Sequence, residues 1–192
     1  YASHAEGGGT TASGYYSHAE GSQTLASGNN SHAEGSQTTA SGYYSHAEGS
    51  RTTASGYYSH AEGYGGKSGS IASGIASHAE GYQTKSHGDY SHSEGEDTSA
   101  SGTNSHAQGW GTIASGISSH AEGYFTTASG RYSHAGGDNS IVSGDTSFIH
   151  STDSSLTGDR SVLLGGRFLI GTEDDTVYVP YLNINNLGTG TS

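Results

Sequence analysis

The chain has 192 residues and a formal net charge of −12 with neutral histidine. Because a phosphate backbone is bound by a basic surface, this charge excludes non-specific nucleic-acid binding. Only 29% of the residues are hydrophobic and 33 are glycine, which argues against a conventional compact core. The absence of cysteine excludes disulfides and thiolate metal sites.

Membrane insertion by this segment is also not expected, since no apolar run approaches the roughly 20 residues of a membrane-spanning helix. The chain begins at Tyr1 without an initiator methionine or a signal peptide. We therefore expect it to be a fragment of a longer protein.

A seven-residue repeat in two alternating versions dominates the sequence. The pentapeptide Ser-His-Ala-Glu-Gly, as in residues 17–21, alternates with Thr-x-Ala-Ser-Gly, as in residues 24–28, and each is followed by two variable residues. The full unit is 14 residues long. A fixed short period is typical of a solenoid, in which each coil stacks only on its neighbours, and it argues against the disorder that the polar composition alone would suggest.

Each heptad predicts a short strand, because its residues alternate in type and successive side chains of a strand point to opposite faces. Positions one, three and five carry Ser or Thr, Ala and Gly; positions two and four carry His and Glu in one strand type, and mostly Thr and Ser in the other. A narrow tube holds only small side chains, so we expect Ser or Thr, Ala and Gly to point inward. A helix is disfavoured by roughly 1 kcal/mol for every glycine.

The register predicts how far the coils extend. The spacing of seven runs from residue 3 to residue 63, residues 65–69 contain a small insertion, and the spacing resumes at Ser70 and persists to about residue 165. In the last coils larger side chains replace the inward Ala, so the roll is expected to widen there; these are Val142, Ile149, Leu156 and Leu163.

The period ends after residue 165. Residues 167–171 and 176–184 read as two strands joined by residues 172–175, and Pro180 places the second on an edge or at a bulge. We therefore divide the chain into a β-roll shaft or head, residues 1–165, and a hairpin-like β connector, residues 166–192.

The Ser-x-Ala-x-Gly heptads between residue 3 and about residue 165 resemble the head repeats of trimeric autotransporter adhesins, the YadA-like heads. This resemblance implies an all-β fold, a left-handed parallel β-roll with 14 residues per coil and three chains around a threefold axis. The phrase Thr-Val-Tyr-Val-Pro-x-Leu-Asn-Ile at residues 176–184 resembles the connector that follows repeat shafts in phage tail-fibre proteins, where it often leads into a trimerising chaperone domain.

The resemblance also implies a trimer interface. In the family, positions two and four of one strand type are usually apolar and face the axis, whereas His and Glu occupy them here until the last coils. The implied seam consists of His18, Glu20, His32, Glu34, His46, Glu48, His60, Glu62, His78, Glu80, Phe148, Val162 and Leu164.

The function implied is a non-enzymatic fibre segment for surface attachment or receptor display, as in an adhesin head or a phage tail fibre. The expected partners are two further copies of the chain and a glycan or protein of a host-cell surface, and the expected location is the extracellular surface or a virion. Two alternatives stay open: an ice-binding β-solenoid that uses the Thr and Ser face, and a passive spacer. Leu25, Ile71, Lys85 and Ile113 interrupt the Thr column that ice binding would use.

The repeated His could in principle take part in catalysis or in metal binding. Adjacent residues such as Ser17 and His18 point to opposite faces of a strand, so they form no catalytic pair, and we expect no enzyme. Stacked coils bring His18 over His32 at ~4.8 Å, and three chains around an axis would gather imidazoles as a transition-metal site. We prefer a ladder of His–Glu hydrogen bonds and assign no metal or cofactor.

The same pairing suggests a pH dependence. Neighbouring carboxylates favour protonated imidazole, so we expect a trimer that is more stable at mildly acidic pH than at about pH 9.

Tyrosines recur at the turn positions and are exposed candidates for ligand contact, with Tyr16, Tyr44 and Tyr58 as the named residues. The alternative is that they cover the edges of the roll and fill clefts between chains.

Overall fold

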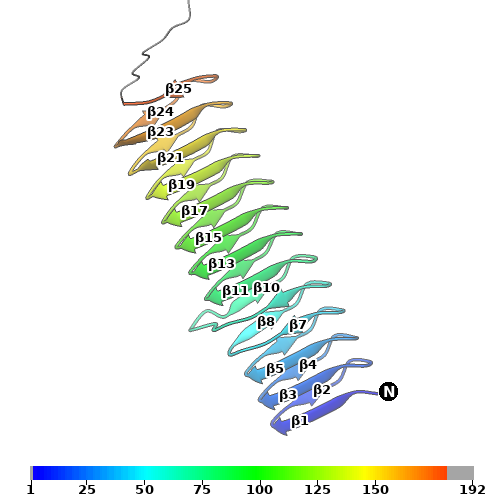
Figure 1. The fold of residues 1–192 in the computed structure, drawn as a ribbon. Coiled ribbons are helices and arrows are strands. Elements are labelled where there is room, and N and C mark those ends of the chain that lie inside the picture. Colours follow the sequence, from blue (N-terminus) through cyan, green and yellow to red (C-terminus); the bar gives the residue numbers. More distant parts are fainter. Residues whose placement is uncertain (1, 181–192) are drawn as a thin grey trace, which may run out of the picture.

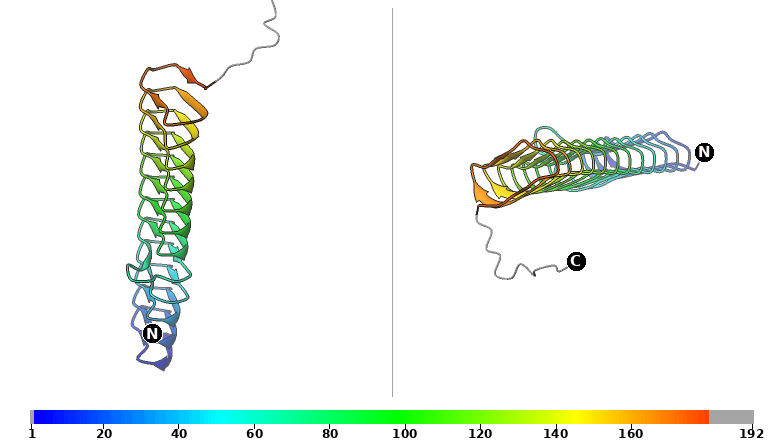
Figure 2. Two further views of the ribbon diagram at one scale, coloured as in Figure 1. Left: turned by 90° about the vertical axis from the view of Figure 1, so that its left-hand side faces the viewer. Right: turned by 90° about the horizontal axis from the view of Figure 1, so that it is seen from above.

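A computed structural model describes residues 2–180 and consists of stacked coils of parallel β-strands (Figure 1). The coils build two long sheets, one of 13 strands and one of 12, which pack face to face around a narrow interior. The roll is long and flattened in the other two views (Figure 2). The prediction of an all-β solenoid is confirmed. Within the described residues no helix is long and apolar enough to cross a membrane.

The first sheet, called here the His–Glu sheet, contains the odd-numbered strands. They are β1 (His4–Gly8), β3 (His18–Ser22), β5 (His32–Ser36), β7 (His46–Ala47), β9 (His60–Ala61), β11 (His78–Tyr82), β13 (His92–Glu96), β15 (His106–Trp110), β17 (His120–Tyr124), β19 (His134–Asp138), β21 (Phe148–Thr152), β23 (Val162–Arg167) and β25 (Val177–Tyr178).

The second sheet, called here the Thr–Ser sheet, contains the even-numbered strands. They are β2 (Thr11–Ala12), β4 (Leu25–Ala26), β6 (Thr39–Ala40), β8 (Thr52–Ala54), β10 (Ser70–Ala72), β12 (Lys85–Ser86), β14 (Ser99–Ala100), β16 (Ile113–Ala114), β18 (Thr127–Ala128), β20 (Ile141–Val142), β22 (Ser155–Leu156) and β24 (Ile170–Gly171).

The register places each residue on its repeat equivalent in the next coil. His18 pairs with His32 and Ala19 with Ala33, and the pattern continues along both sheets. At the insertion His60 pairs with His78, so the extra residues form a loop between β9 and β10 (Figure 1). The expected interruption after residue 64 is therefore absorbed in a loop, and the sheets continue without a break.

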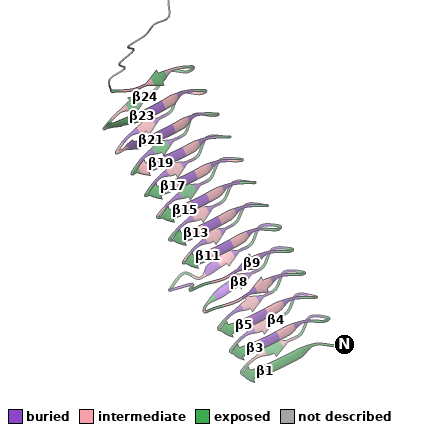
Figure 3. Ribbon diagram, viewed as in Figure 1, coloured by how far each residue is buried: buried purple, intermediate pink, exposed green. Residues whose placement is uncertain are grey.

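The interior is lined by small side chains. From the second coil on, the inward Ala residues and the Ser or Thr residues two positions before them are buried, as Ala19 and Ser17 illustrate. Figure 3 shows buried and partly buried residues alternating along the strands. Toward the C-terminal end the larger inward side chains are also fully buried, in agreement with the sequence pattern: Val142, Ile149, Leu156 and Leu163.

The fifth-position glycines serve two different purposes. Gly88, after β12, is buried, and a Cβ there would overlap the carbonyl oxygen of Gly102 in the next coil. Gly95, in β13, is exposed and has a φ of +103°, and a Cβ there would overlap the carbonyl oxygen of Gly109. The expected inward position is thus wrong for glycines of the His–Glu sheet. There the positive φ breaks the alternation of the strand, and the close approach of the neighbouring coil requires glycine.

The solenoid does not end near residue 165. β24 pairs with β22, and β25 pairs with β23, both in parallel. The described part of residues 166–192 therefore forms a further coil and not a hairpin. The coil contains one extra residue, since Val162 pairs with Val177 and the register shifts between β21 and β23. Pro180 follows β25 and does not lie within it, and residues 181–192 of the expected connector lie outside the described residues.

Replacement of a buried turn glycine tests the close stacking. We expect Gly88→Ala to lower the free energy of unfolding by about 2 kcal/mol or more, because the added methyl collides with backbone that has nowhere to move. Gly8→Ala is the matched control, since a Cβ at Gly8 meets nothing within 4 Å. Urea unfolding followed by circular dichroism measures both; equal stabilities for the two variants would contradict the packing.

Candidate functional site

A continuous column of stacked imidazoles follows the outer face of the His–Glu sheet. Neighbouring ring centroids lie 4.7–4.9 Å apart with interplanar angles of 1–12°. The column comprises His18, His32, His46, His60, His78, His92, His106 and His120. The parallel register forces this arrangement, because equivalent residues of successive coils pair with one another, including His60 with His78 across the insertion.

A column of carboxylates runs beside the imidazoles, two residues further along each strand. Each Glu lies close to the His of its own coil or of an adjacent one: His32 Nε2 is 3.5 Å from Glu34, and His78 Nε2 is 3.3 Å from Glu62 of the preceding coil. These side chains are about one-third exposed. The structure thus brings together the sequence-predicted His and Glu residues from His18 to Glu80 on a single surface.

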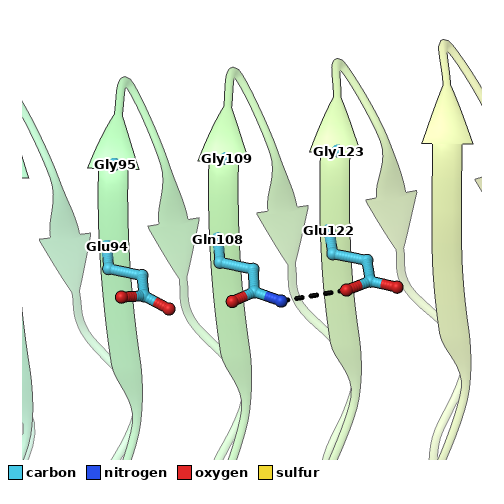
Figure 4. Close-up of a pocket in the computed structure, with 6 residues that line it drawn as sticks. All are labelled: Glu94, Gly95, Gln108, Gly109, Glu122 and Gly123. Atoms are coloured by element: carbon cyan, nitrogen blue, oxygen red, sulfur yellow. Dashed lines mark hydrogen bonds between the residues drawn. The ribbon is translucent and has the colours of Figure 1, made fainter.

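Gln108 replaces Glu once in this column. Its side-chain amide donates a hydrogen bond to Glu122 Oε2 at 2.9 Å, which is drawn in Figure 4 between the equivalent positions of successive strands. The site in Figure 4 is a shallow groove lined by Glu94, Gln108 and Glu122 and the glycines that follow them. A neutral donor here relieves the repulsion between like carboxylates.

The expected ladder of His–Glu hydrogen bonds forms at few positions. His78 and His134 each reach a Glu carboxylate at 3.3 Å with hydrogen-bond geometry. Elsewhere the Nε2 atom is buried and has no hydrogen-bond partner within the described chain, namely in His32, His46, His60, His92 and His106. Buried polar atoms without partners are uncommon in a complete structure, so this face is unsatisfied in the single chain.

Electrostatics favour neutral imidazoles. Burial lowers the pKa of His60, and the flanking imidazoles of His78 and His46 lower it further, against a smaller opposite effect of Glu48 and Glu80. Burial likewise lowers the pKa of His32, His92 and His120, again assisted by neighbouring histidines. The expectation that carboxylates dominate the pKa is therefore wrong for these four residues. Stacking places a like group on each side of an imidazole, and burial penalises its charged form.

The carboxylates respond to one another as well as to the histidines. A hydrogen bond with Glu48 raises the pKa of Glu62, while the same contact, followed by the adjacent imidazoles, lowers the pKa of Glu48. Two neighbouring glutamates of one column thus have pKa values shifted in opposite directions: Glu62 holds its proton more tightly and Glu48 releases it more readily.

The polar columns become apolar at the C-terminal end. His134 is followed in register by Phe148, Val162 and Val177. In the carboxylate column Leu164 occupies the last position, and 43% of it is exposed. The structure therefore places the three sequence-predicted apolar residues of the seam, Phe148, Val162 and Leu164, on the same face as His18 and Glu20.

The YadA head domain repeat, taken as two consecutive copies, matches residues 5–31, 19–45, 33–59, 107–133 and 121–147. These segments together cover half of the chain. The chain belongs to the YadA head repeat family. No curated protein matches it. The assignment agrees with the fold. The coils between the matched segments, residues 60–106, contribute strands to the same two sheets as the matched coils.

The Thr–Ser sheet of the YadA repeats presents a mixed surface. Its outward column passes from Thr53 through Ile71 and Lys85 to Ser99, with Ile141 further along. His87, which lies beyond β12 on this side, contacts the hydroxyl of Ser73 at 2.7 Å. The surface is not a regular array of Thr, so nothing in it favours the ice-binding alternative.

Tyrosines project from the turns that follow the Thr–Ser strands. Tyr16, Tyr44 and Tyr58 occupy the same turn position with φ of 56–58°, and all three are exposed. Tyr44 and Tyr58 stack at 5.1 Å between centroids, and Tyr43 stacks on Tyr57 at 5.2 Å. Asn30 occupies the equivalent position between Tyr16 and Tyr44, so of these three tyrosines only Tyr44 and Tyr58 lie in adjacent coils.

A second aromatic group lies at the opposite turns and was not anticipated from the sequence. Trp110 lies 4.5 Å from Tyr124 and 4.8 Å from Phe125 between ring centroids. Gly111 makes room for it, since a Cβ there would lie 2.7 Å from the Phe125 ring. The signal in the sequence is the aromatic residues at positions six and seven of the His–Glu heptads, which lie at the edge of the roll opposite Tyr16, Tyr44 and Tyr58.

The pKa shifts predict the sign of the pH dependence. A histidine whose folded pKa is below its ordinary value of about 6.5 binds protons more weakly in the folded than in the unfolded chain. Its contribution is present above about pH 6.5 and is lost as the pH falls toward the folded pKa. We expect the free energy of unfolding, measured in metal-free buffer, to decrease between about pH 7.5 and pH 5.5, a window chosen above the ordinary carboxylate pKa.

His120 provides the matched test of that prediction. It faces His106, His134, Glu94 and Glu122, and burial is the first cause of its lowered pKa. We expect His120→Gln to reduce the decrease in stability over this pH range relative to the wild-type chain. A free energy of unfolding that rises as the pH falls would restore the carboxylate-dominated view.

Proposed function

We propose that the chain is a segment of a homotrimeric surface fibre, with three rolls side by side and their His–Glu sheets around a common axis. The fibre would display attachment surfaces at a bacterial surface or on a virion, as an adhesin head or a tail fibre. YadA-like head repeats are extracellular, surface-exposed and adhesive elements, and this function requires no catalysis. The single observation that carries the proposal is the His–Glu face, which is half-buried, incompletely hydrogen-bonded and apolar at one end.

The narrow interior supports association. Most of the fully buried apolar side chains are Ala, so one roll buries little apolar surface for each residue that it orders. Thin repeat structures of this kind gain stability from additional packing partners. Three rolls in contact would extend the small core of each roll into a larger shared one.

The choice of the His–Glu sheet rests on its uniformity. Around a threefold axis each level is lined by three copies of one residue, and on this sheet successive levels repeat the same His and Glu. The buried Nε2 atom of His106 would find a hydrogen-bond partner on an adjacent chain. The Thr–Ser sheet carries Lys85 and alternates Ile with Ser and Thr, which suits a solvent-facing surface.

Attachment is assigned to the edges of the roll. Tyr16, Tyr44 and Tyr58 present rigid, amphipathic rings to solvent at regular intervals, and such rings bind sugars and proteins through their faces with little entropic cost. We propose a host-surface glycan or protein as the partner. A passive spacer would be the outcome if these edges bind nothing.

Leu164 and Ile141 form a matched pair for testing the trimer. Both are apolar residues near the C-terminal end, exposed by 43% and 45%, but they lie on opposite sheets. We expect the chain to sediment at three times its mass of 19.5 kDa, Leu164→Arg to shift it toward monomer, and Ile141→Arg to leave the trimer intact. Burying three unpaired guanidinium groups at one level is the reason. A monomeric wild type, or equal effects of the two variants, would contradict the proposed interface.

Binding to host-cell surfaces tests the second part of the proposal. On a glycan array and on cells, we expect Tyr44→Ser together with Tyr58→Ser to reduce binding by about tenfold or more, since each stacked aromatic contact contributes about 0.5–1.5 kcal/mol beyond its buried area. Tyr90→Ser is the control, because Tyr90 is equally exposed but has no stacked tyrosine. If the double variant binds as well as the wild type, the attachment surface does not include Tyr44 and Tyr58. If the wild type does not bind, the segment is a passive spacer.

A further inference from the structure

We propose that the His–Glu sheet binds transition-metal ions of the Zn²⁺ class between successive coils, each ion held by two imidazoles and one carboxylate. Three sets of side chains have ligand atoms that all lie within 4.8 Å of one another: His32, Glu34 and His46; His60, Glu62 and His78; and His78, Glu80 and His92. This inference rests on the geometry of one chain and goes beyond the fibre function.

The imidazole nitrogens point toward the carboxylates. His78 Nε2 lies 3.3 Å from Glu62 and 3.8 Å from Glu80, and His92 Nε2 lies 3.7 Å from the other oxygen of Glu80. The Nε2 atoms of His60 and His92 are buried although the side chains are partly exposed. These nitrogens and the carboxylate oxygens thus lie close together along the two columns, where an ion would contact both.

The spacing suits a small ion. Nitrogen and oxygen ligands bind Zn²⁺ at about 2.0–2.2 Å, which places ligand atoms of a tetrahedral site about 3.4 Å apart. His78 Nε2 and Glu62 already have this separation. The ligand atoms of His60 and His78 lie within 4.8 Å of each other, on rings that stack in parallel, so the two rings must rotate to direct their lone pairs at one ion. Backbone hydrogen bonds of the sheet hold the backbone that carries all three ligands, so side-chain rotation alone is needed to form the site.

The ligand set identifies the class of metal. Two neutral imidazoles with one carboxylate suit Zn²⁺ and its first-row neighbours, whereas Ca²⁺ and Mg²⁺ take oxygen ligands almost alone. An ion would also satisfy Nε2 atoms that the single chain leaves without hydrogen-bond partners.

The shared histidine fixes the number of ions. His78 belongs to two of the three sets, and one nitrogen ligates one ion, so only one of these two sets fills at a time. The set around Glu34 is separate. We therefore expect two ions for each chain, one in each segment of the column.

The experiment titrates ZnCl₂ into the tag-free full chain by calorimetry, after removal of metal with EDTA. We expect about two ions for each chain, and we expect His78→Gln to halve this number because it removes both overlapping sets. His87→Gln is the matched control, since His87 lies outside the His–Glu sheet, and it should leave the number unchanged. MgCl₂ should show no binding. Co²⁺ absorption bands of a tetrahedral site provide a second readout.

Glu34→Gln keeps the imidazole column intact and provides a second variant if His78→Gln fails to fold, as judged by circular dichroism. It should weaken one of the two sites by about tenfold or more. The proposal is overturned if the wild-type chain shows no saturable Zn²⁺ binding, or if His78→Gln and His87→Gln bind the same number of ions. Sedimentation of the same samples separates this result from the fibre proposal, because a chain that trimerises without binding zinc loses only the metal sites.

Discussion

The close approach of one coil to the next is the constraint on which the rest of the structure depends. Backbone carbonyls such as that of Gly102 lie where a side chain of the preceding coil would be, so glycine is required at the turn and the register has no freedom to slip. Each residue then lies on its own repeat equivalent. The same constraint that aligns Ala19 with Ala33 in the interior aligns His18 with His32 outside.

Stacking of identical residues has opposite consequences for apolar and ionisable groups. In the interior it produces an unbroken row of methyl groups. On the outer face it places imidazole on imidazole and carboxylate on carboxylate, which disfavours charge on all of them at once. The lowered pKa of His60 and the opposite shifts of Glu48 and Glu62 are the result. The lowered pKa favours the neutral form of His60, while Glu48 favours its charged form, so the face offers hydrogen-bonding groups of both kinds to an adjacent chain.

Much of the fold could be predicted from the sequence, because periodicity alone determines strands, coil length, the small-residue interior and the insertion after residue 64. The hairpin expected after residue 165 was wrong. One extra residue lengthens this coil, so the 14-residue spacing is lost from the sequence although Val162 and Val177 still pair in parallel. The direction of the pKa shift was also mispredicted for His32, His60, His92 and His120. Nearest neighbours in the sequence are Glu, whereas burial and the imidazoles 14 residues away have the larger effect, and these are known only from the stacked structure.

Contact between His–Glu sheets of different chains is the central claim, and cross-linking tests it most directly. The chain contains no cysteine, so Glu62→Cys and Thr53→Cys each introduce a single thiol, at partly buried outward positions of opposite sheets. A short bismaleimide should join Glu62→Cys chains into covalent dimers within the trimer and leave Thr53→Cys chains unjoined. Efficient cross-linking of Thr53→Cys, with Glu62→Cys remaining a single chain, would contradict the account.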